Sequence, residues 1–362
     1  MNPSWPRRVW ERQGLLGRLL WTLALPSSFL YLLAVELRNL LYSREWLPVK
    51  SLPCAVISVG NLTVGGTGKT PTALWLGHEL SRRGFRVAIL SRGYKRRQRA
   101  PHLLEPGQDQ RLVLRAGEDP SEAGDEPMMM AKVLGQRVGV GENRYEVGMQ
   151  LLGRSEVDVF VLDDGFQHRQ LKRDLDLLLL GWNGGGWLLR AGPFREPSRA
   201  LGRADLYLVT GSLAEWQPLL AGHPKDAVFV GALKPTGLLT LERGQWKEYP
   251  LGLLDRSKIL AVSAIADPSA FYRMIHEWEG ELVDTMEFPD HHSYSARDWQ
   301  RINRAARNVD LIVTTEKDIL KLVRFPFAKE KLFALRVEMV VENGAALVQS
   351  VEEAIRSKRE GV

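Results

Sequence analysis

The sequence predicts an α/β fold in which helices cover a parallel sheet on both faces. Short apolar runs alternate with helical stretches along most of the chain, and several runs, such as LDLLLL at 175–180, are apolar at almost every position. Strands that are buried on both faces have this pattern, because helices lie on each side of the sheet. The 362 residues, 44% of them hydrophobic, are enough for about two domains with separate cores.

The first expected element is a hydrophobic N-terminal helix. Residues 19–35, LLWTLALPSSFLYLLAV, are uncharged, are flanked by arginines and contain Pro26. A spanning helix needs about 17–25 such residues, and the nearby tryptophans suit a membrane interface. We expect a membrane-associated anchor. The alternatives are a buried core helix and a secretory signal, although no small-residue cleavage site follows.

Two α/β domains are expected after this segment. The first has strands at 54–59, 86–91, 157–163, 175–180 and 205–210, and helices from about 69 to 84, 127 to 134 and 143 to 152. The second has strands at 258–264, 281–286 and 310–315, helices at 268–278 and 296–307, and short antiparallel strands before them at 227–250. The predicted organisation is a hydrophobic segment at 1–50, a core domain at 51–215 and a smaller C-terminal domain at 216–362.

The stretch VGNLTVGGTGKTP at 59–71 predicts a phosphate-binding P-loop between a strand and a helix. Gly65, Gly66 and Gly68 let the backbone approach phosphate oxygens, Lys69 supplies a positive charge, and the Thr70 hydroxyl can reach Mg²⁺. The spacing departs from the general motif at Thr63, where glycine is usual. The alternative is a glycine-rich turn with an exposed lysine. The core domain is therefore expected to be a sheet of the P-loop NTPase kind.

A P-loop needs an acid at the end of a neighbouring strand to hold the metal. Asp163 and Asp164 in VFVLDDGFQH follow a predicted strand, at the sheet edge where the glycine loop also lies. One of them can bind Mg²⁺ while the other orients the loop. The alternative is a pair of solvated turn aspartates.

Phosphoryl transfer to an alcohol also needs a group that accepts the hydroxyl proton. One candidate is Asp125 with Glu126, which precede Pro127; the alternative for Asp125 is a helix N-cap. The other is His291 or His292 after Asp290, and the alternative there is a surface loop. The arginines of SRGYKRR and GPFREPSRAL fit a phosphate clamp or a solvated basic face equally well.

The net charge of the chain limits the classes of molecule that it is expected to bind. A formal charge of +6 and a pI of about 9.4 favour an anionic partner. We expect no nucleic-acid partner, because no recognition helix, zinc spacing or RNP-like motif is present. The single cysteine, Cys54, excludes a disulfide framework and a cysteine-based zinc site.

With these residues identified, the chain resembles the tetraacyldisaccharide 4′-kinase family, the lipid A 4′-kinases of Gram-negative bacteria. The resemblance runs from the N-terminal hydrophobic segment to residues 314–318. Seven motifs follow the family's order: VGNLTVGGTGKTP, SRGY, GDEP, DDGFQH, GPFREP, FPDHH and TEKD.

The resemblance implies an activity and a place in the cell. The γ-phosphate of ATP would pass, with Mg²⁺, to the 4′-hydroxyl of a lipid A disaccharide 1-phosphate, giving lipid IVA in lipid A biosynthesis. The substrate lies in the bacterial inner membrane, so the enzyme would work at its cytoplasmic face, anchored by the N-terminal segment. A basic chain with an apolar segment suits such an acylated, phosphorylated glycolipid.

The resemblance also implies roles for particular residues. Asp125 would be the catalytic base with His291 as partner, and Lys69 would act on the phosphates; which histidine pairs with Asp125 stays open. Nucleotide contacts would come from Thr63, Val64, Gly65, Gly66, Thr67, Gly68, Lys69 and Thr70. Metal-side groups would be Thr70, Asp163, Asp164, Glu126 and Glu196, and substrate-facing groups Arg92, Tyr94, Arg144, His168 and Arg195.

Other functions share parts of this pattern. A membrane-tethered P-loop ATPase switch would hydrolyse ATP without a lipid acceptor and respond to a protein partner. A kinase with a small soluble acceptor would not need residues 19–35. Because His291 lies in the second predicted domain and Asp125 in the first, we expect their pairing to depend on the approach of these domains.

Overall fold

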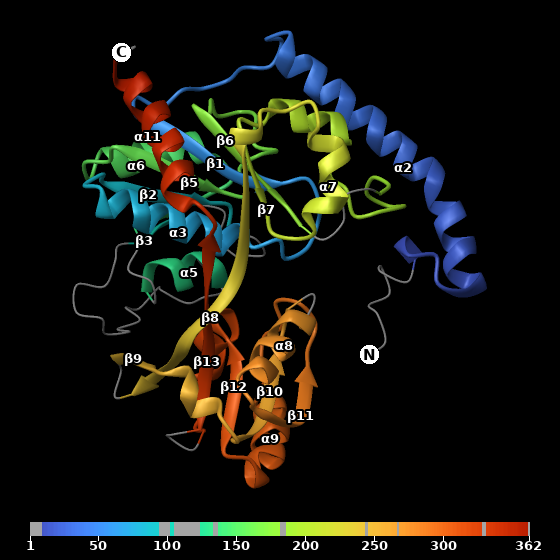
Figure 1. Ribbon diagram of the computed structural model, residues 1–362, viewed down its shortest axis with the longest axis vertical. Helices are drawn as coiled ribbons and strands as arrows, with labels where there is room; N and C mark the ends of the chain where they lie inside the picture. The colour runs from blue at the N-terminus through green and yellow to red at the C-terminus, as the bar shows by residue number, and fades with distance from the viewer. Residues whose placement is uncertain are drawn as a thin grey trace. The chain divides into compact units, whose positions relative to one another are not determined.

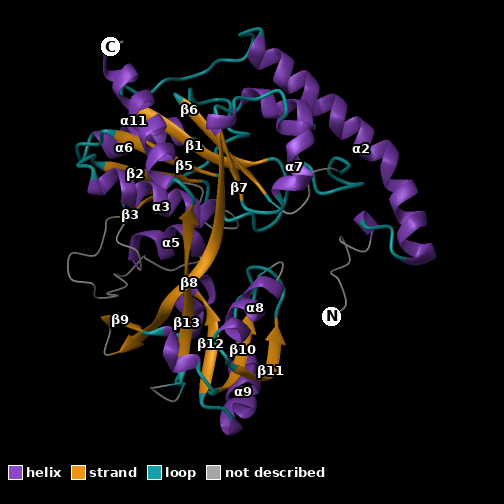
Figure 2. Cartoon of the chain, viewed as in Figure 1, coloured by secondary structure: helices purple, strands orange, loops and turns teal. Residues whose placement is uncertain are grey.

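The computed structural model of the protein describes residues 9–93, 102–104, 124–132, 137–181, 186–242, 245–265, 268–327 and 331–360. The chain forms two compact units, one with residues 1–69, 158–232 and 341–362, the other with residues 70–157 and 233–340. Both units combine helices and strands (Figure 1 and Figure 2). The division at residues 50 and 215 stays a prediction.

The first unit is built on a parallel sheet whose order is β5, β1, β6, β7 and the start of β8. Ile57 of β1 aligns with Val161 of β5 on one side and with Leu175 of β6 on the other. Every residue of β1 is buried, as expected for a strand covered on both faces. The strands are β1 (Ala55–Asn61), β5 (Val159–Asp163), β6 (Leu175–Leu180), β7 (Leu206–Val209) and β8 (Val228–Glu242).

The helices described in the first unit include α2 (Gly14–Ser43), α7 (Leu213–Leu220) and α11 (Gly344–Glu360), with 3₁₀ turns at Ser198–Arg203 and Lys225–Ala227. The sequence prediction omitted α11, the red helix of Figure 1, which packs on β1. Its buried residues Leu347, Val351 and Ile355 recur every four positions, so they form one apolar stripe.

The hydrophobic segment forms most of α2, which continues through Pro26. Among the described residues, α2 is the helix that is long and apolar enough to cross a membrane, judged by length and composition. Most of its apolar surface faces outward: Leu23 and Leu30 are each 66% exposed. The helix is held by hydrogen bonds from the Trp21 indole to the Ala191 carbonyl at 3.0 Å and from the Tyr31 hydroxyl to the Arg195 carbonyl at 2.9 Å.

The second unit begins with α3, whose first residue, Lys69, still belongs to the first unit. β2 pairs in parallel with β4, which pairs in antiparallel fashion with β3. The elements of this half are α3 (Lys69–Arg82), β2 (Val87–Ser91), β3 (His102–Leu104), α5 (Asp125–Lys132), β4 (Val138–Val140) and α6 (Arg144–Leu152).

The other half of the second unit is a sheet in the order β11, β10, β12, β13 and the end of β8, with β9 antiparallel to β8. Short strands were predicted at 227–250, but β8 is one strand of 15 residues. β13 was not predicted. The elements are β9 (Gln245–Tyr249), β10 (Lys258–Ser263), α8 (Ser269–Glu277), β11 (Glu281–Glu287), α9 (Ala296–Ala305), β12 (Leu311–Thr315), α10 (Glu316–Leu322) and β13 (Leu332–Val341), with 3₁₀ turns at Leu251–Leu254 and Ala306–Asn308.

Side chains of β10 alternate between two apolar clusters, one on each face of this sheet. Leu260 and Val262 pack in a cluster with Ile302 of α9. Ile259 and Ala261 pack in a second cluster with Ile275 of α8. Because successive residues of a strand point to opposite faces, one apolar run serves both cores. The predicted α/β class with helices on both faces is confirmed.

Candidate active site

The glycine-rich loop joins β1 to α3. Gly65 and Gly68 have φ of +112° and +87°, a region that residues with side chains rarely adopt. A Cβ placed on Gly65 or Gly66 would meet no atom within 4 Å, and both residues are exposed. The loop therefore offers open backbone ahead of a helix N-terminus, where N–H groups and the helix dipole attract an anion.

The GPFREP segment fixes the path of this loop. The Val64 N–H donates to the Pro193 carbonyl at 2.8 Å, and the Arg195 N–H donates to the Leu62 carbonyl at 2.7 Å. Two strand-like backbone contacts thus bracket Thr63, whose side chain is nearly buried. The segment that the sequence offered as a clamp or a basic face supports the phosphate loop directly.

Lys69, Asp164 and Arg195 form one charged group in the first unit. Lys69 Nζ lies 3.5 Å from the Gly65 carbonyl and 3.9 Å from Asp164 Oδ1. Arg195 Nη1 lies 2.8 Å from both Oδ1 and Oδ2 of Asp164, and 3.4 Å from Gln167 Oε1. Two cations thus flank one carboxylate at the end of the loop, an arrangement that suits an anionic ligand.

The DDGFQH turn is shaped by its close approach to β1. Asp163 ends β5, is 3% exposed and aligns with Val59 of β1. Asp164 follows with φ +53°, an uncommon value for a residue other than glycine. The His168 N–H closes the turn by donating to the Gly165 carbonyl at 2.8 Å, and its side chain is half-buried. The two aspartates therefore lie in distinct settings, one buried and one paired with Arg195.

Glu196 is fully buried and surrounded by donors. Arg203 Nη1 lies 3.0 Å and Arg38 Nη2 3.4 Å from its carboxylate, and Asn39 Nδ2 donates to it at 2.9 Å. Burial alone would raise the pKa of Glu196, but the charge and hydrogen bond of Arg203, with Asn39 and Arg38, hold that pKa below its ordinary value. Glu196 thus contacts the side chains of Arg38 and Asn39 in α2 and of Arg203 in the Ser198–Arg203 turn. Its role as a metal-side group stays a prediction.

Thr70 and Glu126 come together in the second unit. Thr70 Oγ1 lies 3.5 Å from Glu126 Oε2, and Glu126 Oε1 forms an ion pair with Lys317 of α10. α5 begins at Asp125, two residues before the predicted start at 127, and the side chain of Asp125 lies outside what the structure describes. The GDEP and TEKD motifs, far apart in the sequence, therefore meet at Glu126.

The remaining substrate candidates are less informative. Arg92 follows β2 and is exposed, whereas Arg144 opens α6 and is 5% exposed, with Nη1 3.5 Å from the Glu142 carbonyl. Tyr94 lies outside the described residues. Neither arginine is brought to another predicted site residue by a described contact.

The two histidines of FPDHH have different surroundings. His292 Nε2 lies 3.1 Å from Asp298 Oδ2, and its ring stacks on Phe288 at a centroid distance of 4.9 Å. His291 has φ +62°, and its Nε2 lies 3.8 Å from Asp290 Oδ1. His292 is thus engaged in packing its own loop, and which of the two histidines pairs with Asp125 stays a prediction.

The donors fit Mg²⁺ of a bound nucleotide better than a metal held by protein alone. Within the described ranges, no group of three or more His, Cys, Asp or Glu side chains could hold a metal ion. Mg²⁺ commonly takes one or two carboxylates and completes its shell with phosphate oxygens and water. In the first unit, Asp163 is a buried carboxylate of that kind. In the second unit, Glu126 beside the Thr70 hydroxyl is another.

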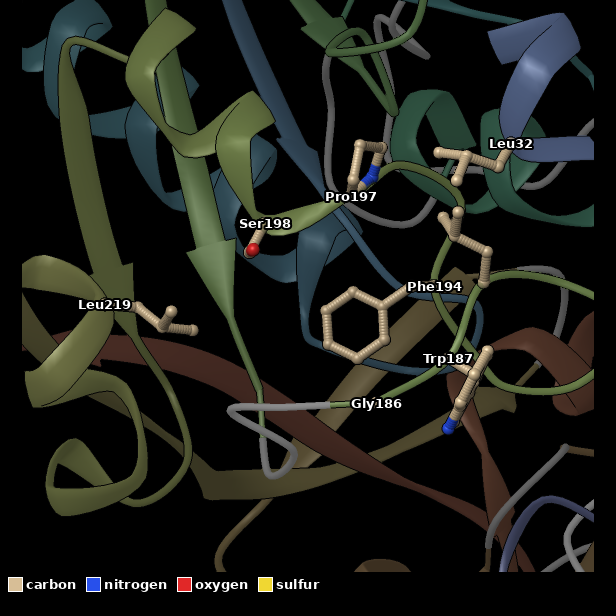
Figure 3. A pocket seen from close by; sticks show the side chains of 8 residues that line it. Leu32, Gly186, Trp187, Phe194, Pro197, Ser198 and Leu219 are labelled. Carbon is tan, nitrogen blue, oxygen red and sulfur yellow. The ribbon is translucent and has the colours of Figure 1, made fainter. Parts of the chain in front are cut away.

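An apolar pocket of about 280 Å³ lies beside α2 in the first unit. Leu32 of α2, Trp187, Phe194 and Leu219 are among its lining side chains (Figure 3). No local pattern predicts this pocket, because its residues come from three separate segments. It is suited to hydrocarbon, since apolar side chains predominate in its lining.

Sequence reasoning also missed the partners that hold the site residues. Gln167 contacts Arg195. Glu196 is contacted by Asn39 and by Arg203, and Glu126 is contacted by Lys317. Lys317 belongs to the quoted TEKD motif but had no role. Gln167 and Asn39 had no local signal, because their partners are distant in sequence, whereas Arg203 is only seven positions from Glu196.

Comparisons with known proteins agree with this geometry. A model of the family described as tetraacyldisaccharide-1-P 4′-kinase matches residues 20–356. Tetraacyldisaccharide 4′-kinases of Syntrophus aciditrophicus and Geobacter sulfurreducens are 38% and 37% identical, over 93% and 95% of this chain and 94% and 96% of theirs. A crystal structure of the "apo" form of LpxK from Aquifex aeolicus in complex with ATP is 33% identical, with a TM-score of 0.75 over 93% of this chain and 99% of that one. The chain therefore belongs to the tetraacyldisaccharide-1-P 4′-kinase family.

Proposed function

We propose that the chain transfers the γ-phosphate of ATP to the 4′-hydroxyl of a tetraacyldisaccharide 1-phosphate, giving lipid IVA. The observation that carries the proposal is the open glycine loop ending at Lys69, with Asp164 and Arg195 beside it, in a chain of this family. The 4′-oxygen forms a bond to the γ-phosphorus, the bond from that phosphorus to the β–γ bridging oxygen breaks, and ADP leaves.

The loop and its neighbours bind and orient the nucleotide. The exposed backbone at Gly65 and Gly66 contacts the phosphates, whereas the Val64 N–H is already bound to the Pro193 carbonyl. Lys69 neutralises charge on the transferring group. Thr70, Asp163 and Glu126 are the proposed metal-side groups, with Asp164 and Glu196 as further candidates. Mg²⁺, when bound with ATP, would neutralise phosphate oxygens. Arg195 orients Asp164 and adds positive charge near Lys69.

Asp125 is the proposed base, with His291 as its partner. The 4′-hydroxyl proton passes to the Asp125 carboxylate as the new bond forms, and an imidazolium nearby keeps that carboxylate ionised before transfer. Both residues belong to the second compact unit. The uncommon backbone conformation of His291 supports a functional role, because strained residues gather at active sites. Arg92, Tyr94, Arg144 and His168 are proposed substrate-facing groups.

The enzyme is proposed to act at the cytoplasmic face of the inner membrane. The exposed leucines of α2 provide the apolar surface for attachment, and the net positive charge favours anionic lipid. The apolar pocket beside α2 suits a hydrocarbon chain of the lipid. Crossing the bilayer and lying along it are both compatible with this surface.

The proposal is tested by the dependence of ADP release on the acceptor. Purified protein in detergent micelles is given ATP and Mg²⁺ with and without lipid A disaccharide 1-phosphate, and Lys69→Ala is the control. We expect ADP to form at least about tenfold faster with the lipid, because chemistry requires the positioned hydroxyl. An equal rate without lipid would favour the membrane-tethered ATPase instead.

A further inference from the structure

Lys317 is the residue of the TEKD segment that reaches the proposed catalytic region. Its ammonium group pairs with Glu126 Oε1 across 191 positions of sequence. α10, which carries Lys317, packs on α5, which carries Glu126. The side chains are 34% and 27% exposed, so water screens the pair only in part.

The two oxygens of Glu126 have different neighbours. Oε1 pairs with Lys317, whereas Oε2 lies 3.5 Å from the Thr70 hydroxyl in the first turn of α3. A carboxylate held through one oxygen loses the freedom to rotate, and its other oxygen keeps a fixed direction. Lys317 therefore determines which way Glu126 points toward the phosphate-loop helix.

The start of α10 is itself held rigidly. The Thr315 hydroxyl donates to Asp318 Oδ2 at 2.7 Å, and the same oxygen accepts from the Ala264 N–H at 2.9 Å. Asp318 is fully buried. Lys317 is the second residue of this helix, where the helix dipole disfavours a cation. Helix stability alone does not account for a lysine here, whereas contact with Glu126 does.

We propose that Lys317 is a positioning residue that fixes the Glu126 carboxylate beside Thr70 for phosphoryl transfer. This rests on the proposed role of Glu126 near the nucleotide metal. Lys317 acts through Glu126, so its removal should weaken the use of Mg²⁺ and slow turnover while leaving lipid affinity unchanged.

The test is a double-mutant cycle with Lys317→Ala, Glu126→Gln and the double variant. It measures kcat and, by calorimetric titration with a non-hydrolysable ATP analogue present, the Mg²⁺ concentration for half-saturation. We expect Lys317→Ala alone to lower kcat about tenfold and to raise the Mg²⁺ requirement severalfold. In the Glu126→Gln background, the same substitution should lower kcat by less than about a further twofold. Single-turnover label transfer keeps the slow variants measurable.

Two further variants separate positioning from folding. Lys317→Arg keeps the charge and should recover most of the rate. Lys247→Ala removes a Lys–Glu pair of the β8–β9 hairpin and should leave kcat and the Mg²⁺ requirement unchanged. An unchanged kcat in Lys317→Ala, or the full loss repeated in the Glu126→Gln background, would overturn the proposal. Normal turnover in Glu126→Gln would instead overturn the role of Glu126.

Discussion

Arg195 Nη1 lies 2.8 Å from both carboxylate oxygens of Asp164, and this contact joins the GPFREP segment to the turn after β5. The same segment donates a backbone hydrogen bond to the phosphate loop through the Arg195 N–H. Arg195 therefore holds the phosphate loop through its backbone and the Asp164 carboxylate, which lies beside Lys69, through its side chain.

Arg195→Ala is expected to lower kcat by about 10²-fold, because it removes a cation from the transferring phosphate and releases Asp164. Arg195→Lys should recover only part of this, since an ammonium keeps the charge but lacks the planar shape and the further N–H donors of the guanidinium. Arg199→Ala, which loses an ion pair with Glu36, is the matched control and should retain the rate. A normal kcat in Arg195→Ala would remove this residue from the site.

Lys69→Ala, Asp125→Ala and Asp163→Ala are each expected to lower kcat by at least about 10²-fold, because each removes a group that acts in the transition state. Single-turnover transfer of labelled phosphate measures this without interference from product release. Near-normal turnover in Asp125→Ala would exclude that residue as the base. His291→Ala should be more damaging than His292→Ala when kcat is compared between variants of equal melting temperature.

Leu23→Asp combined with Leu30→Asp is expected to weaken binding to anionic vesicles by at least about tenfold, because each leucine transfers substantial apolar area into lipid. Sedimentation with vesicles measures the bound fraction. Val283→Asp, at an exposed position of β11, is the control and should bind as the parent does. Equal binding by all three proteins would contradict attachment through α2.

The raised pKa of Glu316 predicts that the folding stability of the protein depends on pH. Burial raises the pKa of Glu316 from 4.5 to about 7, although the Val337 N–H opposes the shift. The folded chain thus holds this proton more tightly than the unfolded chain, so its contribution to stability is complete below pH 4.5 and is lost as pH rises toward 7.

Glu316→Gln stays neutral and should be more stable than the parent at pH 8 by about 1–3 kcal/mol, with little difference near pH 4. Urea unfolding at both pH values measures this. Glu281→Gln, at an exposed position of β11, is the control. The same stability difference at pH 4 and pH 8 would show that Glu316 does not titrate between them.

The fold was readable from the sequence where local patterns determine it. β6 (Leu175–Leu180) matches its apolar run residue for residue, and α6 begins one residue after its predicted start, at its Asn143 cap. β13 and α11 were missed although they carry ordinary strand and helix patterns. Leu347, Val351 and Ile355, for example, recur every four positions, and this spacing of one helix face is visible in the sequence.

The residues of the site could be predicted from their motifs, but most of the contacts between motifs could not. Lys69, Asp164 and Arg195 were each named from short motifs, and the structure brings them together. Arg203 lies seven residues from Glu196 and reaches it through the Ser198–Arg203 turn. The pairing of Glu126 with Lys317, and of Glu196 with Asn39, depends on how distant segments pack. Local spacing carries no such information, because each motif alone also fits a solvated turn.

The position of the new phosphate tests the central claim most directly. Lipid A disaccharide 1-phosphate is incubated with the protein, ATP and Mg²⁺, and the lipid product is examined by phosphorus NMR and mass spectrometry. The account predicts one added phosphate monoester on the 4′-oxygen for each ADP formed. ADP formation with an unmodified lipid, or phosphate at another hydroxyl, would contradict it.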